Sequence, residues 1–432
     1  MNKRNPETKI KTDKYYFECT TCGRKFNSGE LRYLCPDCSS QNMPGLPPGG
    51  VLKTLYYYKE IKGRYKRTQL FDRLKEKEYL DILPIQSEKS LTRLKVGKTP
   101  LYLIPELDLN TKPDKSSQLP FELYLKDDSQ NPTFSFKDRA SDLVCAFASE
   151  QGYNNIVTAS TGNAGSSLAG ICASHKQKAI VIVPYGAPMA KLVQTIAYGA
   201  RLIPVLGNYD QAFDLSISAS EHFGWYNRNT AFNPFTIEGK KIVSLEIFQQ
   251  LRRTLPDRIF VPVGDGVIIS GVYKGFEDLL RLGLIESMPV IVAVQSAGSD
   301  NLIRNLTADV FLSRKSHTLA DSISVDIPRN FYMARNFISA YQGESVIVSD
   351  QEILKAVFVL GRNTGLFTEP AAAAGFAGFL KYLEEDKINS KTRNVVLLTG
   401  SGLKDSSAFH SAINMPDPIE PDLNTIIKMN FT

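Results

Sequence analysis

Lys137 stands in the stretch NPTFSFKDRA, residues 131–140, directly after two aromatic and two hydroxyl side chains. An amine that folds behind Phe134 and Phe136 would lose hydration, and loss of hydration favours its neutral form. A neutral lysine amine can attack a carbonyl carbon and form a Schiff base. Lys137 is therefore a candidate for covalent catalysis. The alternative is a solvated lysine at the start of an amphipathic helix, and the local pattern alone leaves both open.

Four of the six cysteines form two C-x-x-C pairs, CTTC and CPDC, which twelve residues separate. This spacing is typical of a tetrahedral zinc site in which two knuckles hold one ion. Four thiolates leave no coordination position open, so we expect the zinc to be structural. The predicted ligands are Cys19, Cys22, Cys35 and Cys38. The other two, Cys145 and Cys172, lie in apolar surroundings and are interpreted as core residues.

Three loops rich in glycine and hydroxyl residues follow apolar runs: STGNAGSS at 160–167, PVGDGVIISG at 262–271 and LTGSGLKD at 398–405. Backbone N–H groups at a helix N-terminus bind anions, so the first two loops are candidates for holding a carboxylate or a phosphate. The second loop is not a dinucleotide fingerprint, because Ile269 stands where that motif needs glycine. An ordinary turn is the alternative for each loop.

These loops need strands and helices to position them, and the sequence supplies both in alternation. β-branched apolar runs separated by segments with helical spacing indicate a parallel sheet covered on both faces. Ligands of such sheets gather at the carboxyl ends of the strands. We expect strands at 121–128, 155–160, 179–184, 201–206, 258–264, 289–295 and 394–400, and helices at 135–152, 161–176, 189–200 and 267–283. Residues 111–120 are expected to form a loop.

The composition is that of an ordinary globular protein, with 43% hydrophobic and 22% charged residues among 432. The N-terminus lacks the apolar segment of a secretory signal and no long apolar run occurs, so we expect a cytoplasmic protein without a membrane partner. Residues 1–70 carry 14 Lys and Arg against 6 Asp and Glu. This surplus is interpreted as a basic surface, with nucleic-acid binding a weak alternative.

Taken together and in this order, the motifs NPTFSFKDRA, STGNAGSSLAG, FNPFTIEGKK, VPVGDG, GLFTEPAAAA and LTGSGLKD resemble those of fold-type II pyridoxal phosphate enzymes, above all threonine synthases. The cysteine pairs resemble the N-terminal ribbon of many threonine synthases. The resemblance implies an α/β fold with two three-layer α/β domains and a small zinc-ribbon-like module. It implies the module at 1–45, a large cofactor-binding domain at 46–137 and 231–432, and a smaller mobile domain at 138–230.

The resemblance also implies roles for individual residues. Lys137 would form the Schiff base with pyridoxal 5′-phosphate and then act as the base at Cα. Asn163 would bond the ring O3′ oxygen, and Thr399 would face the pyridine nitrogen. The loop for the cofactor phosphate would comprise Gly264, Asp265, Gly266, Val267 and Ile268. The loop for the substrate carboxylate would comprise Ser160, Thr161, Gly162, Asn163 and Ala164.

The chain departs from the family pattern where threonine synthases bind the phosphate of O-phosphohomoserine. They commonly carry arginine where Thr236 stands and an Asn-Ser pair where Thr230 and Ala231 stand. Loss of a bidentate arginine is not a conservative change. Lys240 or Lys191 could compensate for it.

Two further departures lie near the cofactor. Phe134 replaces the glycine of the family's NPTGSFKDR, which puts a bulky group near the site. Val267 and Ile268 stand where the phosphate loop usually carries glycine and asparagine.

Three functions follow from these observations. The first is a threonine synthase, a lyase that acts on a small amino-acid substrate. The second is a cysteate-synthase-like replacement on O-phosphoserine or an amino-acid ammonia-lyase. The third is a non-catalytic binding protein on the same fold, against which Lys137 argues. The sequence is compatible with a homodimer and identifies no allosteric effector.

Overall fold

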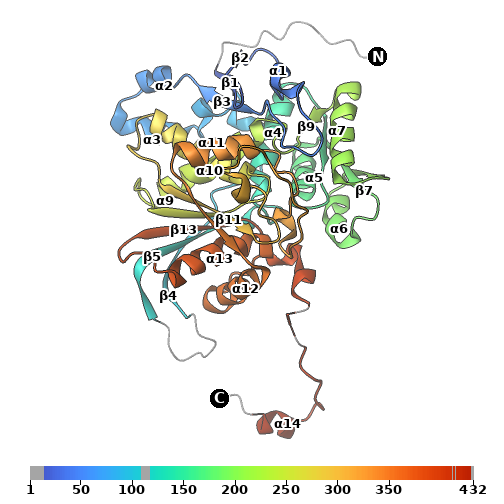
Figure 1. The fold of residues 1–432 in the computed structure, drawn as a ribbon, viewed down its shortest axis with the longest axis vertical. Coiled ribbons are helices and arrows are strands. Elements are labelled where there is room, and N and C mark those ends of the chain that lie inside the picture. Colours follow the sequence, from blue (N-terminus) through green and yellow to red (C-terminus); the bar gives the residue numbers. More distant parts are fainter. Residues whose placement is uncertain (1–13, 109–116, 411, 414, 430–432) are drawn as a thin grey trace.

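The chain folds around three β-sheets, which the computed structural model describes for residues 14–108, 117–410, 412–413 and 415–429 (Figure 1). The largest sheet has six strands in the order β12-β11-β10-β13-β5-β4. All neighbours are parallel except β4 and β5. The strands are β4 (Leu101–Leu107), β5 (Ser117–Asp127), β10 (Arg258–Pro262), β11 (Val290–Ser296), β12 (Glu344–Val348) and β13 (Arg393–Leu398).

The other two sheets are smaller and differ in strand direction. The four-stranded sheet, in the order β8-β7-β6-β9, is wholly parallel. It comprises β6 (Asn155–Ala159), β7 (Lys178–Pro184), β8 (Arg201–Val205) and β9 (Tyr226–Asn227). The three-stranded sheet near the N-terminus is antiparallel. It comprises β1 (Tyr15–Cys19), β2 (Lys25–Asn27) and β3 (Leu52–Tyr56), so it extends beyond residue 45.

Helices cover both faces of the four-stranded and six-stranded sheets, whereas α14 lies apart from the body of the molecule (Figure 1). The helices of the described residues are α1 (Pro36–Ser39), α2 (Tyr58–Arg64), α3 (Arg67–Glu76), α4 (Lys137–Glu150), α5 (Asn163–His175), α6 (Met189–Ala197), α7 (Tyr209–Phe223), α8 (Phe235–Lys240), α9 (Ile242–Gln250), α10 (Val267–Arg281), α11 (Phe331–Ala340), α12 (Asp350–Thr364), α13 (Pro370–Glu384) and α14 (Leu423–Lys428).

Strand β10 shows why the parallel strands are apolar throughout. Ile259 and Val261 join the core that includes α10 residues, whereas Phe260 joins the core that includes α13 residues. Successive side chains of a strand point to opposite faces, so a strand with helices on both sides needs apolar residues at every position. The predicted strands and helices are present with small differences in their ends.

The prediction of a loop at 111–120 is wrong for residues 117–120. Residues 117–120 begin β5, where Ser117 pairs with Leu107 and Gln118 pairs with Glu106. A polar composition suggested a loop, but pairing with β4 satisfies the backbone of this segment. Residues 111–116 lie outside the described residues.

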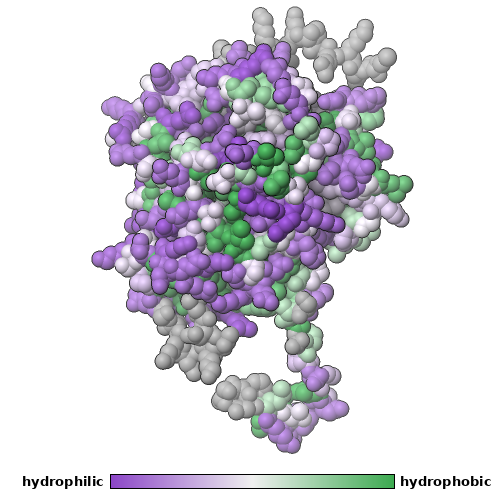
Figure 2. Space-filling model, viewed as in Figure 1, coloured by the Kyte–Doolittle hydropathy of each residue, from purple (hydrophilic) through white to green (hydrophobic). Residues whose placement is uncertain are grey.

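The surface in Figure 2 is mainly hydrophilic, with apolar residues gathered near the middle of this face and at its right-hand edge beside β7. Exposed apolar side chains near β7 include Tyr185 and Leu206, which are 72% and 92% exposed. Within the described part of the chain, no helix combines the length and the apolarity needed to cross a membrane.

Candidate active site

A cavity of about 460 Å³ lies where the carboxyl ends of β6 and β10 face each other. Its wall includes the first residue of α4, the N-terminal loops of α5 and α10, and a segment at 321–329. A crevice at the carboxyl ends of parallel strands is the usual ligand site of such sheets. The four-stranded and six-stranded sheets therefore supply opposite sides of one site.

Lys137 enters this cavity from the first position of α4. Burial lowers the pKa of its amine, the charge of Arg228 lowers it further, and Glu369 and Asp265 partly oppose these effects. Among the described residues, no carboxylate lies within ion-pair distance of the Lys137 amine. Ser135 accepts a hydrogen bond from the Lys137 backbone N–H at 3.1 Å, so the start of the helix is fixed. The site therefore presents an amine whose neutral form is favoured.

The loop before α5 places five predicted residues in the cavity wall: Ser160, Thr161, Gly162, Asn163 and Ala164. The α5 helix begins at Asn163, and the first turn of a helix carries backbone N–H groups without intrahelical partners. A carboxylate or phosphate is the natural ligand of such a turn.

The loop before α10 presents a second helix N-terminus to the same cavity. Its five predicted residues, Gly264, Asp265, Gly266, Val267 and Ile268, all line the wall. Gly266 has φ +82°, a conformation that favours glycine. A Cβ atom at Gly264 would lie 2.9 Å from the Ile323 Cα, so glycine also allows the 321–329 segment to approach. The cavity thus has two separate positions for anions.

Asp265 brings a carboxylate into the second loop. Its Oδ1 accepts a hydrogen bond from the Arg329 backbone N–H at 3.2 Å, and its carbonyl accepts one from Asn330. Burial raises the pKa of Asp265, while Arg329, Lys137 and Lys240 lower it. The side chain is therefore held toward 329–330, but its charge still acts on both lysines.

Glu369 is a further acid of the site. Asn163 Nδ2 donates to both Glu369 carboxylate oxygens at 2.9 Å, and burial raises the Glu369 pKa against the effect of Asn163 and Lys137. Thr399, predicted to face the pyridine nitrogen, is buried at the end of β13, and its carbonyl accepts from Phe136 N. Thr399 is not part of the cavity wall, so its role stays a prediction.

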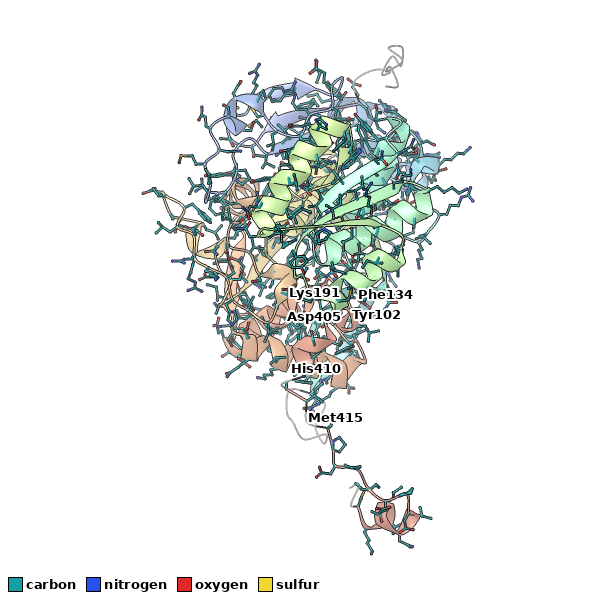
Figure 3. The ribbon with its side chains drawn as sticks, turned by 90° about the vertical axis from the view of Figure 1, so that its right-hand side faces the viewer. Tyr102, Phe134, Lys191, Asp405, His410 and Met415 are labelled. Carbon is teal, nitrogen blue, oxygen red and sulfur yellow. The ribbon has the colours of Figure 1, made fainter. Side chains whose placement is uncertain are left out.

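Two ion pairs join the two sides of the cavity. Lys191 of α6 lies 2.7 Å from Asp321, and Arg329 pairs with Asp210 of α7. Figure 3 shows Lys191 beside Asp405, and the charge of Lys191 lowers the Asp405 pKa that burial raises. These contacts connect the helices of the four-stranded sheet to the 321–329 segment across the cavity.

Residues 92–400 match the family described as "Pyridoxal-phosphate dependent enzyme". The chain belongs to this family. It is 35% identical to a threonine synthase of Methanocaldococcus jannaschii over 94% of this chain and 97% of the relative, and 35% identical to one of Bacillus sp. over 76% and 89%. A threonine deaminase structure from Solanum lycopersicum superposes with a TM-score of 0.63 at 20% identity, covering 88% of this chain and 96% of the other. The chain is a threonine synthase-like, pyridoxal-phosphate-dependent lyase, as its motifs predicted.

The residues present fit pyridoxal phosphate. An amine without an ion pair, a glycine loop at the N-terminus of α10 and a second helix N-terminus share one enclosed space. We propose that Lys137 holds the cofactor covalently and that the loop at 264–268 takes its phosphate. For Asn163 to bond the ring O3′ oxygen as predicted, its amide nitrogen must give up a hydrogen bond that it makes to Glu369.

Phe134 does not fill the cavity as its size suggested. It has φ +65°, the left-handed conformation for which the family's glycine is suited, and its side chain is 50% exposed. Its carbonyl accepts from Ser401 N at 3.1 Å, which ties the residue to the loop after β13. The departure from glycine therefore costs backbone strain rather than space in the site.

Several residues in the cavity wall or behind it were not identified from the sequence. The 321–329 segment has no periodicity and no glycine motif, so nothing in the sequence marked it. Glu369 had a signal, because an acid directly before a proline and a run of alanines begins α13 at the site. Arg228 lies after a strand of two residues that the pattern did not reveal.

The four predicted zinc ligands come together. Their sulfur atoms all lie within 4.8 Å of one another, with Cys19 Sγ to Cys38 Sγ at 3.8 Å and Cys22 Sγ to Cys35 Sγ at 3.9 Å. Tetrahedral zinc with Zn–S bonds of about 2.3 Å needs sulfur separations of about 3.8 Å. The four thiols therefore fit zinc, and we propose that they bind it.

We predict about one zinc per chain in protein purified under reducing conditions. Cys35→Ser should lose the metal and unfold at a lower temperature, because structural zinc contributes folding energy. Metal analysis by mass spectrometry checks the first result and thermal denaturation the second. Cys145→Ser is the matched control, a buried cysteine outside the cluster. Zinc-free wild type, or zinc retained in Cys35→Ser, would refute the site.

Proposed function

We propose that this enzyme is a threonine synthase, which converts O-phosphohomoserine and water to threonine and phosphate. The observation that carries the proposal is the cavity itself, where the Lys137 amine and two helix N-termini line the same space. The substrate offers an α-carboxylate for the α5 loop and an amino group for the cofactor. The threonine synthases to which the chain is similar support the same reaction.

Lys137 is the group that moves protons in this proposal. When bound, pyridoxal phosphate supplies the electron sink that lets a proton leave Cα. The Lys137 amine, whose pKa burial lowers, takes that proton. A second proton leaves Cβ as the Cγ–O bond breaks and phosphate departs, and Cγ gains a proton to become the methyl group. A water oxygen then adds at Cβ, and a proton returns to Cα. The hydroxyls of Ser160 and Thr161 and the N–H groups of the α5 turn orient the substrate carboxylate meanwhile.

Closure of the cavity keeps water away until the addition step. The Lys191–Asp321 and Arg329–Asp210 pairs join the two sides, and each has one exposed partner. Exposed pairs are individually weak, so they can break and re-form as substrate enters and product leaves. We propose that residues 138–230 move as the smaller domain in this step.

The test measures phosphate release by purified holoenzyme with O-phosphohomoserine and with O-phosphoserine, and threonine by chromatography. We expect phosphate and threonine in equal amounts from O-phosphohomoserine and little phosphate from O-phosphoserine. Heat-denatured enzyme with free pyridoxal phosphate is the control for uncatalysed release. Phosphate from O-phosphoserine alone, or from neither compound, would contradict the proposal.

One observation favours the second candidate, a replacement or elimination on a different amino acid. Thr236 is fully buried and its hydroxyl donates to the Asn233 carbonyl at 2.8 Å, so it does not reach the cavity. The arginine of threonine synthases has no substitute at this position. The phosphate must then be bound by other residues, or the substrate carries none.

A further inference from the structure

Lys240 is a second lysine of the cavity, and the proposed reaction does not use it. It is the last residue of α8, its side chain is fully buried, and it lines the cavity wall. Its amine donates to the Thr236 carbonyl at 3.2 Å. Among the described residues, no carboxylate forms an ion pair with it. Burial lowers the pKa of the Lys240 amine well below its usual range, so its charged form is stable here only when an anion meets it in the cavity.

The neighbouring Lys241 shows what a satisfied buried lysine looks like in this chain. Its amine lies 2.5 Å from a Glu238 oxygen and 2.7 Å from an Asp278 oxygen. Two adjacent lysines are thus buried to the same extent, and only Lys241 is neutralised by the protein. Lys240 is therefore as buried as Lys241 but lacks the acidic partner that Lys241 has.

Arg228 is a second buried cation without a carboxylate. Its Nη1 donates to the hydroxyl of Thr230, which lines the cavity, and its Nε donates to Ser141. Its Nη2 is buried with no partner among the residues that the structure describes. The charges that act on Lys240 are those of Arg228, Lys137 and Asp265, two cations and one acid. This corner of the cavity therefore has an excess of positive charge.

The position of Lys240 relates this charge to the second anion position. A Cβ atom at Gly271 would lie only 2.6 Å from the Lys240 Cβ, so the lysine packs against the second turn of α10. The N-terminus of α10 faces the same cavity. An ammonium group and a helix N-terminus at one wall suit a phosphate dianion better than a carboxylate, which carries a single charge.

We propose that Lys240, with Arg228 beside it, binds a phosphate monoester in the cavity and replaces the arginine that is missing at position 236. The phosphate belongs either to the substrate or to the cofactor. In the first case the inference rests on the proposed function and names the residues that select its phosphorylated substrate. In both cases the hydrogen bond from Arg228 to the Thr230 hydroxyl links Arg228 to the cavity wall.

The experiment compares wild type with Lys240→Met and Lys240→Arg, and Lys178→Met is the control. Lys178 is an exposed lysine at the start of β7 and does not line the cavity. Inorganic phosphate is titrated into each holoenzyme, with thermal unfolding as the readout. Pyridoxal phosphate is titrated into the full chain after removal of its cofactor, with absorbance as the readout.

If the substrate supplies the phosphate, Lys240→Met should raise the half-saturating concentration of inorganic phosphate about tenfold or more and leave that of pyridoxal phosphate unchanged. If the cofactor supplies it, the pyridoxal phosphate titration should show that change instead. Lys240→Arg should restore most of the binding, and Lys178→Met should change neither titration. Arg228→Met should weaken binding of the same ligand, and agreement between the two variants would argue against a folding defect in one of them.

Unchanged binding of both ligands in folded Lys240→Met would overturn the proposal, as would an equal effect of Lys178→Met. The proposed function fails in a different way. Wild-type enzyme that binds phosphate through Lys240 but releases none from O-phosphohomoserine would retain the phosphate site and lose the proposed substrate.

Discussion

Lys137→Ala is expected to lower turnover about 10³-fold or more and to remove the visible absorbance of lysine-linked pyridoxal phosphate. The reason is the environment of the amine, which lines the cavity without an ion pair and has a pKa that burial lowers, with Glu369 opposing this effect and Arg228 adding to it. Another base is not expected to take its place, because Lys240, the other lysine of the lining, extends from α8 and its amine donates to the Thr236 carbonyl. Spectra and steady-state kinetics on the same preparation check both results.

The controls separate loss of chemistry from loss of fold. Lys178→Ala changes an exposed lysine of β7 and should leave spectrum and turnover as in wild type. In the absence of cofactor, Lys137→Ala should be at least as stable to unfolding as wild type, because the substitution removes an amine that burial makes costly. A retained absorbance band in Lys137→Ala would show that another residue holds the cofactor.

The sheet could be predicted from the sequence because its physical demands act on consecutive residues. Strands buried on both faces must be apolar throughout, and runs such as AIVIVP and NVVLLT meet that demand. The sequence also marks both ends of helix α12. Its capping box of Ser349 and Glu352 and the left-handed Gly365 mark both ends.

The candidate site was predictable only where it is local in sequence. The loops before α5 and α10 can be recognised in the sequence, because glycine and hydroxyl residues follow apolar strands there. Arg228 and Lys240 could not be recognised as unpaired, because a missing partner is a property of three-dimensional packing. The same holds for Glu369, whose bond to Asn163 spans 206 residues. A single sequence gives residue types but not which charges remain unsatisfied.

The buried ionic network behind α4 explains how Lys137 is held in place. Arg139 lies two residues after Lys137, and its guanidinium makes two bonds of 2.8 Å to Glu246 and two, of 2.5 and 2.9 Å, to Asp128. Lys126 adds a bond of 2.7 Å to Glu246. All four side chains are nearly or fully buried. The network fixes the first turn of α4 against β5 and α9.

Glu246→Ala is expected to destabilise the enzyme by about 3–5 kcal/mol, because it leaves Arg139 and Lys126 buried with Asp128 as their remaining acid. Chemical denaturation followed by circular dichroism measures this free energy of unfolding. Glu344→Ala is the matched control, since its pair with Arg258 at 3.0 Å is partly exposed and should contribute about 1 kcal/mol or less. A similar loss in both variants would contradict the argument.

The pH dependence of the same variant tests the charge of Glu246 directly. Burial raises its pKa, but Arg139 and Lys126 outweigh burial and lower the pKa to about 2 from an ordinary value of 4.5. A depressed folded-state pKa gives stability that is present above the ordinary value and is lost as the pH falls toward 2. The difference in unfolding free energy between wild type and Glu246→Ala should therefore be constant near neutral pH and shrink below about pH 4.5. A constant difference down to pH 3 would mean that the side chain acts through packing and that its charge does not position α4.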